Sequence, residues 1–235
     1  MKDFLAVRGI AFESVNVLEG DGLEKLRALG ARSVPVVARG GKFVFAQVIK
    51  DVVAFLDLRE DTGPALSPTD LAARYERVLT AAVATVRQMP DGALANTLPN
   101  RPRSWRVLMH HVFQIPTEFL DALAEDRVLA YENLVAGPPA DMATSAAIAA
   151  FGEALRRRFA DWWREGGRDL DFSRPFHAYF GETTLHEMFE RTVWHSTQHV
   201  RQVQSLLQQA GIAPDDPLGP EAIRGLPLTD RVWDE

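Results

Sequence analysis

Clusters of proline and glycine divide most of the chain into four long segments. From Ser67 onward these breakers separate four stretches of roughly 20 residues, each with the apolar spacing of an amphipathic helix. The first opens with Ser67, Pro68 and Asp70, residue types that start helices. The predicted helices span 67–89, 104–124, 144–165 and, from Thr183 or Thr184, the residues up to Gly211. Four helices of this length separated by breakers predict a four-helix bundle.

The N-terminal part of the chain has a different pattern, with short elements in the order α-β-α-β-β-α. A helix ends at Gly9, residues 12–17 alternate like a strand, and a second helix stops at Gly30. Two β-branched or aromatic runs around Gly40 and Gly41 indicate a hairpin, and residues 48–58 have helical spacing.

The fold class that follows is a multidomain α+β protein, mainly α. A linker rich in charge, glycine and proline separates the two patterns, and the C-terminal residues are too rich in proline for a long helix, so we expect them to wrap the bundle or to pack on a partner. The predicted divisions are a small α/β domain at 1–58, a linker at 59–67, a bundle at 68–212 and a tail at 213–235.

Composition excludes several classes of function. The net charge of −6 arises from mixed signs with no basic run, which argues against nucleic acid as a partner. No window reaches the 18 apolar residues of a membrane span, and the N-terminus lacks the features of a signal peptide, so we expect a cytoplasmic protein. The chain has no cysteine, so any transition-metal site must use His, Asp or Glu.

Two histidines on the fourth predicted helix are candidate metal ligands. His195 and His199 are four residues apart and lie along one edge of its apolar face, so both imidazoles can reach one point. His186 falls on the opposite edge. That apolar face consists of Leu185, Met188, Phe189, Thr192, Ser196, Val200, Val203 and Leu207. By itself such a pair is weak evidence, because histidines at this spacing are common on helix surfaces.

The second predicted helix adds a third candidate. His111 sits at the edge of its buried face, whereas His110 points away from that face. Three imidazoles from facing helices would leave one coordination position open for water or substrate. Gln202 projects near the edge that carries His195 and His199 and is a candidate to orient a ligand. The position of His177 before the fourth helix is not predicted.

Three other residues bear on the shape of this site. Pro116 has no N–H to donate to the carbonyl of Val112, one turn earlier, so we expect a bend in the second helix. Tyr179 and Phe180, just before the fourth helix, are candidates for the pocket entrance.

Residues 66–212 resemble the DinB-like superfamily of metal-dependent four-helix bundles. The resemblance rests on "VLMHHVFQI" in the second helix and "HEMFERTVWHSTQHVRQV" in the fourth. It implies a three-histidine site at His111, His195 and His199, followed closely by a glutamine. The resemblance implies zinc or nickel as the metal. Members of the superfamily include thiol-dependent S-transferases and isomerases, and they often form homodimers.

Residues 9–45 resemble the C-terminal part of a glutaredoxin. "SVPVV" corresponds to the motif whose proline is cis and whose preceding residue receives the cysteinyl group of glutathione, here Val34 and Pro35. The first strand and the CxxC motif are absent, which excludes thiol–disulfide catalysis, and "FAQVIKD" replaces the residues that hold the rest of glutathione. Either the domain is degenerate or the true start codon lies upstream.

Three functions follow as hypotheses. The leading one is a thiol-dependent transferase or isomerase, in which the three-histidine metal activates glutathione or another low-molecular-weight thiol toward a small-molecule substrate. The first alternative is a hydrolase of a small amide or ester that uses metal-bound water, although no glutamate stands beside the histidines to act as a base. The second alternative is a non-catalytic metal-binding or dimerisation module.

Overall fold

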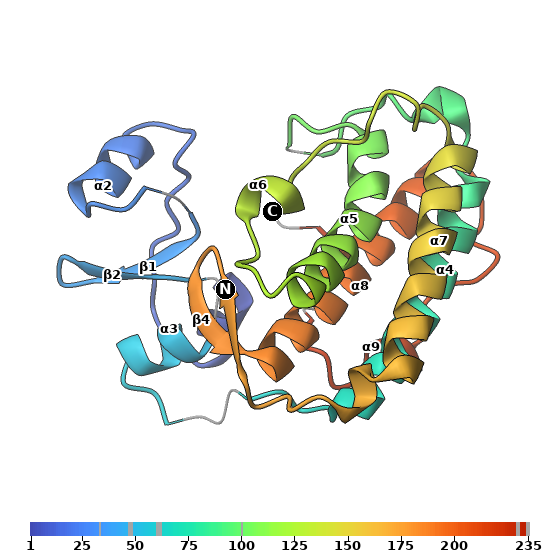
Figure 1. Cartoon of the computed structure of the whole chain (residues 1–235). Coiled ribbons are helices and arrows are strands. Elements are labelled where there is room, and N and C mark those ends of the chain that lie inside the picture. The colour runs from blue at the N-terminus through green and yellow to red at the C-terminus, as the bar shows by residue number, and fades with distance from the viewer. Residues whose placement is uncertain (33, 47–48, 60–62, 100, 229–230, 234–235) are drawn as a thin grey trace. The chain divides into compact units, whose positions relative to one another are not determined.

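The chain is mainly helical, with two small two-stranded sheets (Figure 1). A computed structural model describes residues 1–32, 34–46, 49–59, 63–99, 101–228 and 231–233. The chain divides into two compact units, Met1–Gly63 and Pro64–Glu235. The division falls within the expected linker at 59–67, of which residues 60–62 lie outside the described parts. No helix in the described parts combines the length and the apolar content that crossing a membrane requires.

The first unit is built around one β-hairpin. Strands β1 and β2 pair antiparallel from Val36 opposite Phe45 to Arg39 opposite Lys42. Gly40 and Gly41 form the turn with φ of +59° and +75°, the backbone that a two-residue hairpin turn with a glycine pair adopts. This confirms the predicted hairpin. The elements of this unit are α1 (Lys2–Val7), α2 (Gly22–Ala28), β1 (Val36–Arg39), β2 (Lys42–Phe45) and α3 (Ile49–Phe55).

The predicted strand at residues 12–17 is wrong. This segment has no strand structure, and Phe12 and Val15 are 43% and 41% exposed. An isolated strand leaves its backbone groups without ladder partners, and the sheet of this unit contains only β1 and β2 among the described residues. The observed order in this unit is therefore α-α-β-β-α, and the alternating pattern reflects an extended loop.

The second unit contains the four long helices that the sequence predicts. A side-chain oxygen caps each N-terminus: Ser67, Ser104, Thr144 and Thr184 each accept a hydrogen bond from a backbone N–H three residues on. Thr184 also forms a capping box with Glu187. The elements are α4 (Pro68–Gln88), η1 (Asp91–Ala93), α5 (Trp105–Ala124), α6 (Tyr131–Leu134), α7 (Ser145–Glu165), η2 (Gly167–Asp169), β3 (Pro175–Ala178), β4 (Gly181–Thr184), α8 (Leu185–Gln209) and α9 (Pro220–Ile223).

The long helices pack around one hydrophobic core. Helix α4 contacts α7 and α8, and α5 also contacts both of these helices (Figure 1). Every residue of the apolar face predicted on α8 is buried, which confirms that face as the core side of the helix. Helices α5 and α7 approach closely at Gly152, where an added Cβ atom would lie 2.4 Å from the Phe113 ring.

Two connecting segments add structure that the sequence pattern did not specify. Residues 175–184 form the hairpin β3–β4, with Phe176 opposite Thr183, and His177, whose position the sequence did not predict, lies on β3. The C-terminal tail packs on α4 and α8, one of the two outcomes we expected. Asp216 forms an ion pair with Arg77 at 2.7 Å, and the Trp233 indole donates to Ser205 Oγ at 3.2 Å.

Candidate metal centre

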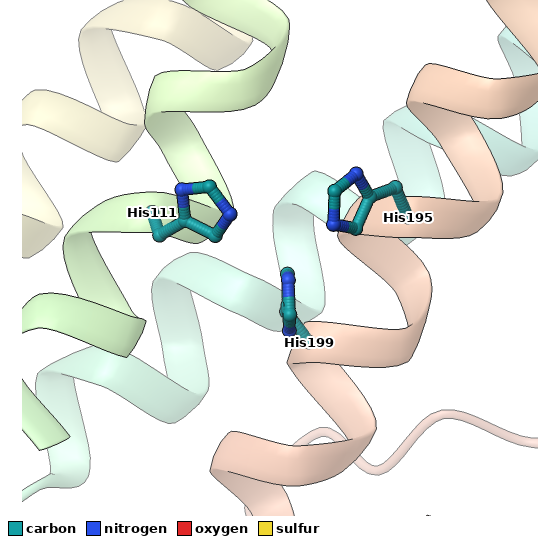
Figure 2. Close-up of side chains that lie close together, drawn as sticks. All are labelled: His111, His195 and His199. Atoms are coloured by element: carbon teal, nitrogen blue, oxygen red, sulfur yellow. The ribbon is translucent and has the colours of Figure 1, made fainter. Parts of the chain in front are cut away.

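Three histidines from two helices converge in the second unit. His111 lies on α5, and His195 and His199 lie one turn apart on α8 (Figure 2). Their ring centroids are 4.8 to 5.7 Å apart, and one ring nitrogen from each lies within 4.8 Å of the other two. His111 and His199 are each only 7% exposed, and His195 is partly exposed. These are the three residues that the sequence predicts as ligands, and they are close enough to hold a metal ion.

The spacing of the nitrogens fits a metal after small side-chain movements. A tetrahedral zinc ion about 2.0–2.1 Å from each nitrogen places its ligand atoms about 3.3 Å apart. Nitrogens within 4.8 Å of one another lie about 1.5 Å or less from that spacing, a difference comparable to the reach of a side-chain rotation. No carboxylate belongs to the cluster among the described residues, so a divalent ion there would keep its full charge.

The surroundings of His111 and His195 favour the neutral imidazole that metal ligation requires. Burial, with smaller contributions from the neighbouring His199 and Arg103, lowers the pKa of His111 to about 3. Burial also lowers the pKa of His195 well below its ordinary value, and His199 and His111 add to this effect. A neutral imidazole presents a lone pair to a metal, whereas a protonated one cannot bind.

A hydrogen bond orients one of the three rings. His199 Nδ1 donates to Gln202 Oε1 at 2.7 Å, so Nε2 is the atom that His199 offers to a metal. Gln202 is itself held, because its Nε2 donates to the carbonyl of Val232 in the tail at 3.1 Å. On α5, the backbone of Leu134 in α6 acts on the His111 ring and opposes the lowering of its pKa. The glutamine was predicted from the sequence, whereas the Leu134 backbone carries no side-chain signal and was missed.

A buried hydroxyl joins the two ligand-bearing helices beside the histidines. Pro116 has no N–H for the carbonyl of Val112, and Ser196 Oγ donates to that carbonyl at 3.3 Å instead. Because the serine hydrogen is used there, the Tyr75 hydroxyl must donate to Ser196 Oγ, at 2.9 Å. Helix α5 continues through the proline. Val112 and Ser196 follow His111 and His195 directly, so this bond fixes the spacing of the ligands.

The other histidines lie outside the cluster. His110 was predicted to point away from the buried face, and it is instead buried, with its ring stacked on Phe151 of α7 at 5.4 Å. The prediction failed because α7 covers the second side of α5, so this helix has more than one buried face. His186 bonds to the carbonyl of Leu66 through Nε2, and exposed His177 lies on β3 near Glu182.

In the first unit, the Val34–Pro35 peptide bond is cis, as the sequence predicts. The Pro35 carbonyl accepts a hydrogen bond from Ala46 N at 2.9 Å, which fixes the start of the hairpin. Val34 is 46% exposed. Both residues are therefore placed at one end of the β1–β2 hairpin, on the surface of this unit.

No protein-family model, curated protein or solved structure matches this chain. The case for function therefore depends on the residues of the site.

Proposed function

We propose that the protein is a metal-dependent enzyme of the DinB-like type, with zinc or nickel bound by His111, His195 and His199. The observation that carries the proposal is the convergence of three imidazoles from two helices, with no carboxylate in the cluster among the described residues. Three protein ligands leave a fourth position open, which is the pattern of catalytic rather than structural zinc sites.

The residues around the ligands support a preformed site. Gln202 holds the His199 ring, and the Ser196 hydroxyl holds α8 against α5. Ligands fixed in this way bind a metal without ordering a flexible segment, and the partial exposure of His195 provides access to the open position.

A bound divalent ion would supply Lewis acidity that lowers the pKa of a thiol or a water in the open position. We favour a low-molecular-weight thiol such as glutathione, whose thiolate would attack an electrophilic small molecule. This choice follows from the resemblance of the bundle to thiol-dependent transferases and from the resemblance of residues 9–45 to a glutaredoxin. Hydrolysis is less well supported, because no carboxylate stands in the described cluster to act as a general base.

Metal analysis of protein purified without a histidine tag tests the site. We expect about one equivalent of zinc or nickel in the unmodified protein and its loss in His111→Ala, His195→Ala and His199→Ala. His177→Ala is the matched control, because this exposed histidine lies outside the cluster, and it should retain the metal. Equal, negligible metal in all samples would exclude the proposed centre.

Turnover assays separate the candidate reactions. Electrophilic substrates should be converted by the metal-loaded protein only when glutathione or a related thiol is present. Conversion that is independent of thiol would instead identify a hydrolase. A metal with four protein ligands in its coordination spectrum would indicate a structural centre in a binding module.

A further inference from the structure

A small cavity lies in the second unit, between the C-terminal end of α5 and the start of β3. Its volume is about 90 Å³, which gives room for several water molecules. Its walls come from α5, from the turn that follows this helix and from residues 174–177. Because an α-helix rises about 1.5 Å per residue, Ala122 in the wall lies roughly 16 Å along α5 from His111. The cavity is therefore separate from the candidate metal centre.

Backbone hydrogen bonds hold both walls of the cavity in place. The Arg127 N–H donates to the carbonyl of Ala122 at 3.0 Å, which closes the turn after α5. The Leu129 N–H donates to the carbonyl of His177 at 2.9 Å, which joins this turn to β3. Phe176 of β3 is only 5% exposed and belongs to the hydrophobic core. A ligand would therefore meet a preformed cavity and need not order the chain around it.

One guanidinium group in the wall has no partner in the part of the chain that the structure describes. Arg174 lines the cavity, and its Nε is buried without a hydrogen bond. Its side chain also forms no ion pair with any described residue. The Arg174 carbonyl accepts from the Leu185 N–H at 2.9 Å, so the backbone from which the side chain extends is tied to the start of α8. A buried charged donor without an acceptor is unfavourable, and an oxyanion in the cavity would satisfy it.

The other basic residues of the cavity already have acidic partners. Arg127 donates from both Nη atoms to the Glu118 carboxylate, at 2.6 and 3.2 Å. His177 is exposed, and its Nδ1 lies 3.8 Å from the Glu182 carboxylate on the neighbouring strand. Arg174 is therefore the basic residue of this cavity that is left to bind an anion.

The nearby acidic residues do not pair with Arg174. Asp126 lines the cavity but is exposed, so water and salt screen its charge. Asp171 is bonded to Ser173, whose N–H and hydroxyl donate to its Oδ1 at 2.9 and 2.6 Å. These bonds lower the pKa of Asp171 and the charge of Arg174 adds to the effect, without an ion pair between the two side chains. The guanidinium group is thus free to take a carboxylate from outside the described chain.

Apolar side chains form most of the remaining wall and decide between kinds of anion. An inorganic ion gains nothing from apolar walls, whereas a short hydrocarbon chain gains by leaving water. A planar guanidinium group also matches the two oxygens of a carboxylate. The apolar lining residues are Ala122, Leu123, Val128, Pro175 and Phe176.

We propose that this cavity is a binding site for a small aliphatic carboxylate. Arg174 donates to the carboxylate oxygens, and the apolar walls surround the hydrocarbon chain. The proposal goes beyond the proposed function, because it concerns a second site and needs no metal.

Calorimetric titration of the full-length protein with propionate tests the cavity, with propionamide and inorganic phosphate as comparison ligands. We expect saturable binding of propionate and weaker binding of both comparison ligands. Arg174→Gln should weaken propionate binding about tenfold or more. The matched control is Arg168→Gln, because this exposed arginine lies 3.7 Å from Asp169 and outside the cavity lining. It should bind propionate like the unmodified protein.

The same titration with and without bound zinc separates this site from the metal centre. Propionate affinity should be equal in both forms. Binding that needs zinc and is unchanged in Arg174→Gln would place propionate on the metal and overturn the proposal. Phosphate or propionamide bound as tightly as propionate would overturn it too.

A second measurement needs no variant of Arg174. The Nε–H group of this arginine gives its own nitrogen resonance in the unmodified protein, and propionate should shift that resonance along the same binding curve. A resonance that stays unchanged at saturating propionate would overturn the site, even if Arg174→Gln fails to fold in a thermal unfolding assay.

Discussion

Among single residues, Gln202 directly orients the candidate metal ligand His199 through a hydrogen bond. Its Oε1 accepts from His199 Nδ1, and its Nε2 donates to the carbonyl of Val232, so the amide is bonded on both sides. A ring held at Nδ1 keeps its tautomer and direction, and it needs no reorientation when Nε2 binds a metal. Gln202 therefore connects the tail to the metal centre.

Replacing this amide should weaken metal binding without unfolding the protein. We expect Gln202→Leu to reduce zinc affinity by roughly 10-fold, within the 10–100-fold range typical of residues that orient ligands. Competition with a chromophoric chelator measures the affinity. Gln198→Leu is the matched control, because Gln198 also donates to the Val232 carbonyl, at 2.8 Å, but does not contact His199. Equal affinities in the two variants would show that the contact with His199 contributes nothing.

Between secondary-structure elements, the close packing of α5 and α7 requires a glycine at position 152. A Cβ on Gly152 would lie 2.4 to 2.7 Å from three atoms of the Phe113 ring, and this ring is fully buried. An alanine there favours the helix by about 1 kcal/mol but must displace a ring that has no free space. The steric effect is larger than the gain in helix propensity.

Gly152→Ala should therefore destabilise the second unit by roughly 1–2 kcal/mol, at the lower end of the 1–3 kcal/mol typical of overpacked cores. Denaturant unfolding measures the change in the free energy of unfolding. Gly92→Ala, in η1, is the comparison: no heavy atom lies within 4 Å of its added Cβ, and its backbone is outside the left-handed region, so we expect little change. A Gly152→Ala protein as stable as the unmodified one would contradict the close packing of α5 and α7.

Helices and their ends could be predicted because the signals are local. Ser67, Ser104 and Thr184 precede amphipathic stretches and cap them in the structure, and the same periodicity placed His195 and His199 on one edge. Features that depend on distant partners could not be predicted this way. Residues 12–17 alternate like a strand but have no neighbour to pair with, and His110 is buried by a helix that follows much later in the chain.

For the molecule as a whole, the division into two units places all candidate metal ligands in the second unit. All six histidines follow residue 109, so every candidate metal ligand lies in the second unit. The hydrogen bond from His199 to Gln202, and the bond from Ser196 to Val112 that joins α8 to α5, also lie within that unit. The first unit contains the residues whose sequence resembles a glutaredoxin, and none of the three histidines lies in it.

A chain that begins at Pro64 should therefore fold and bind metal like the full-length protein. We expect the same stoichiometry and a zinc affinity within about twofold, because no ligand or orienting contact is removed. The fragment 1–63 should be unstable alone, since only Leu5, Leu26, Ala31, Val52 and Val53 form its described apolar core. Circular dichroism and metal analysis of both fragments test these expectations. Loss of metal from a folded 64–235 fragment would show that the first unit takes part in the centre.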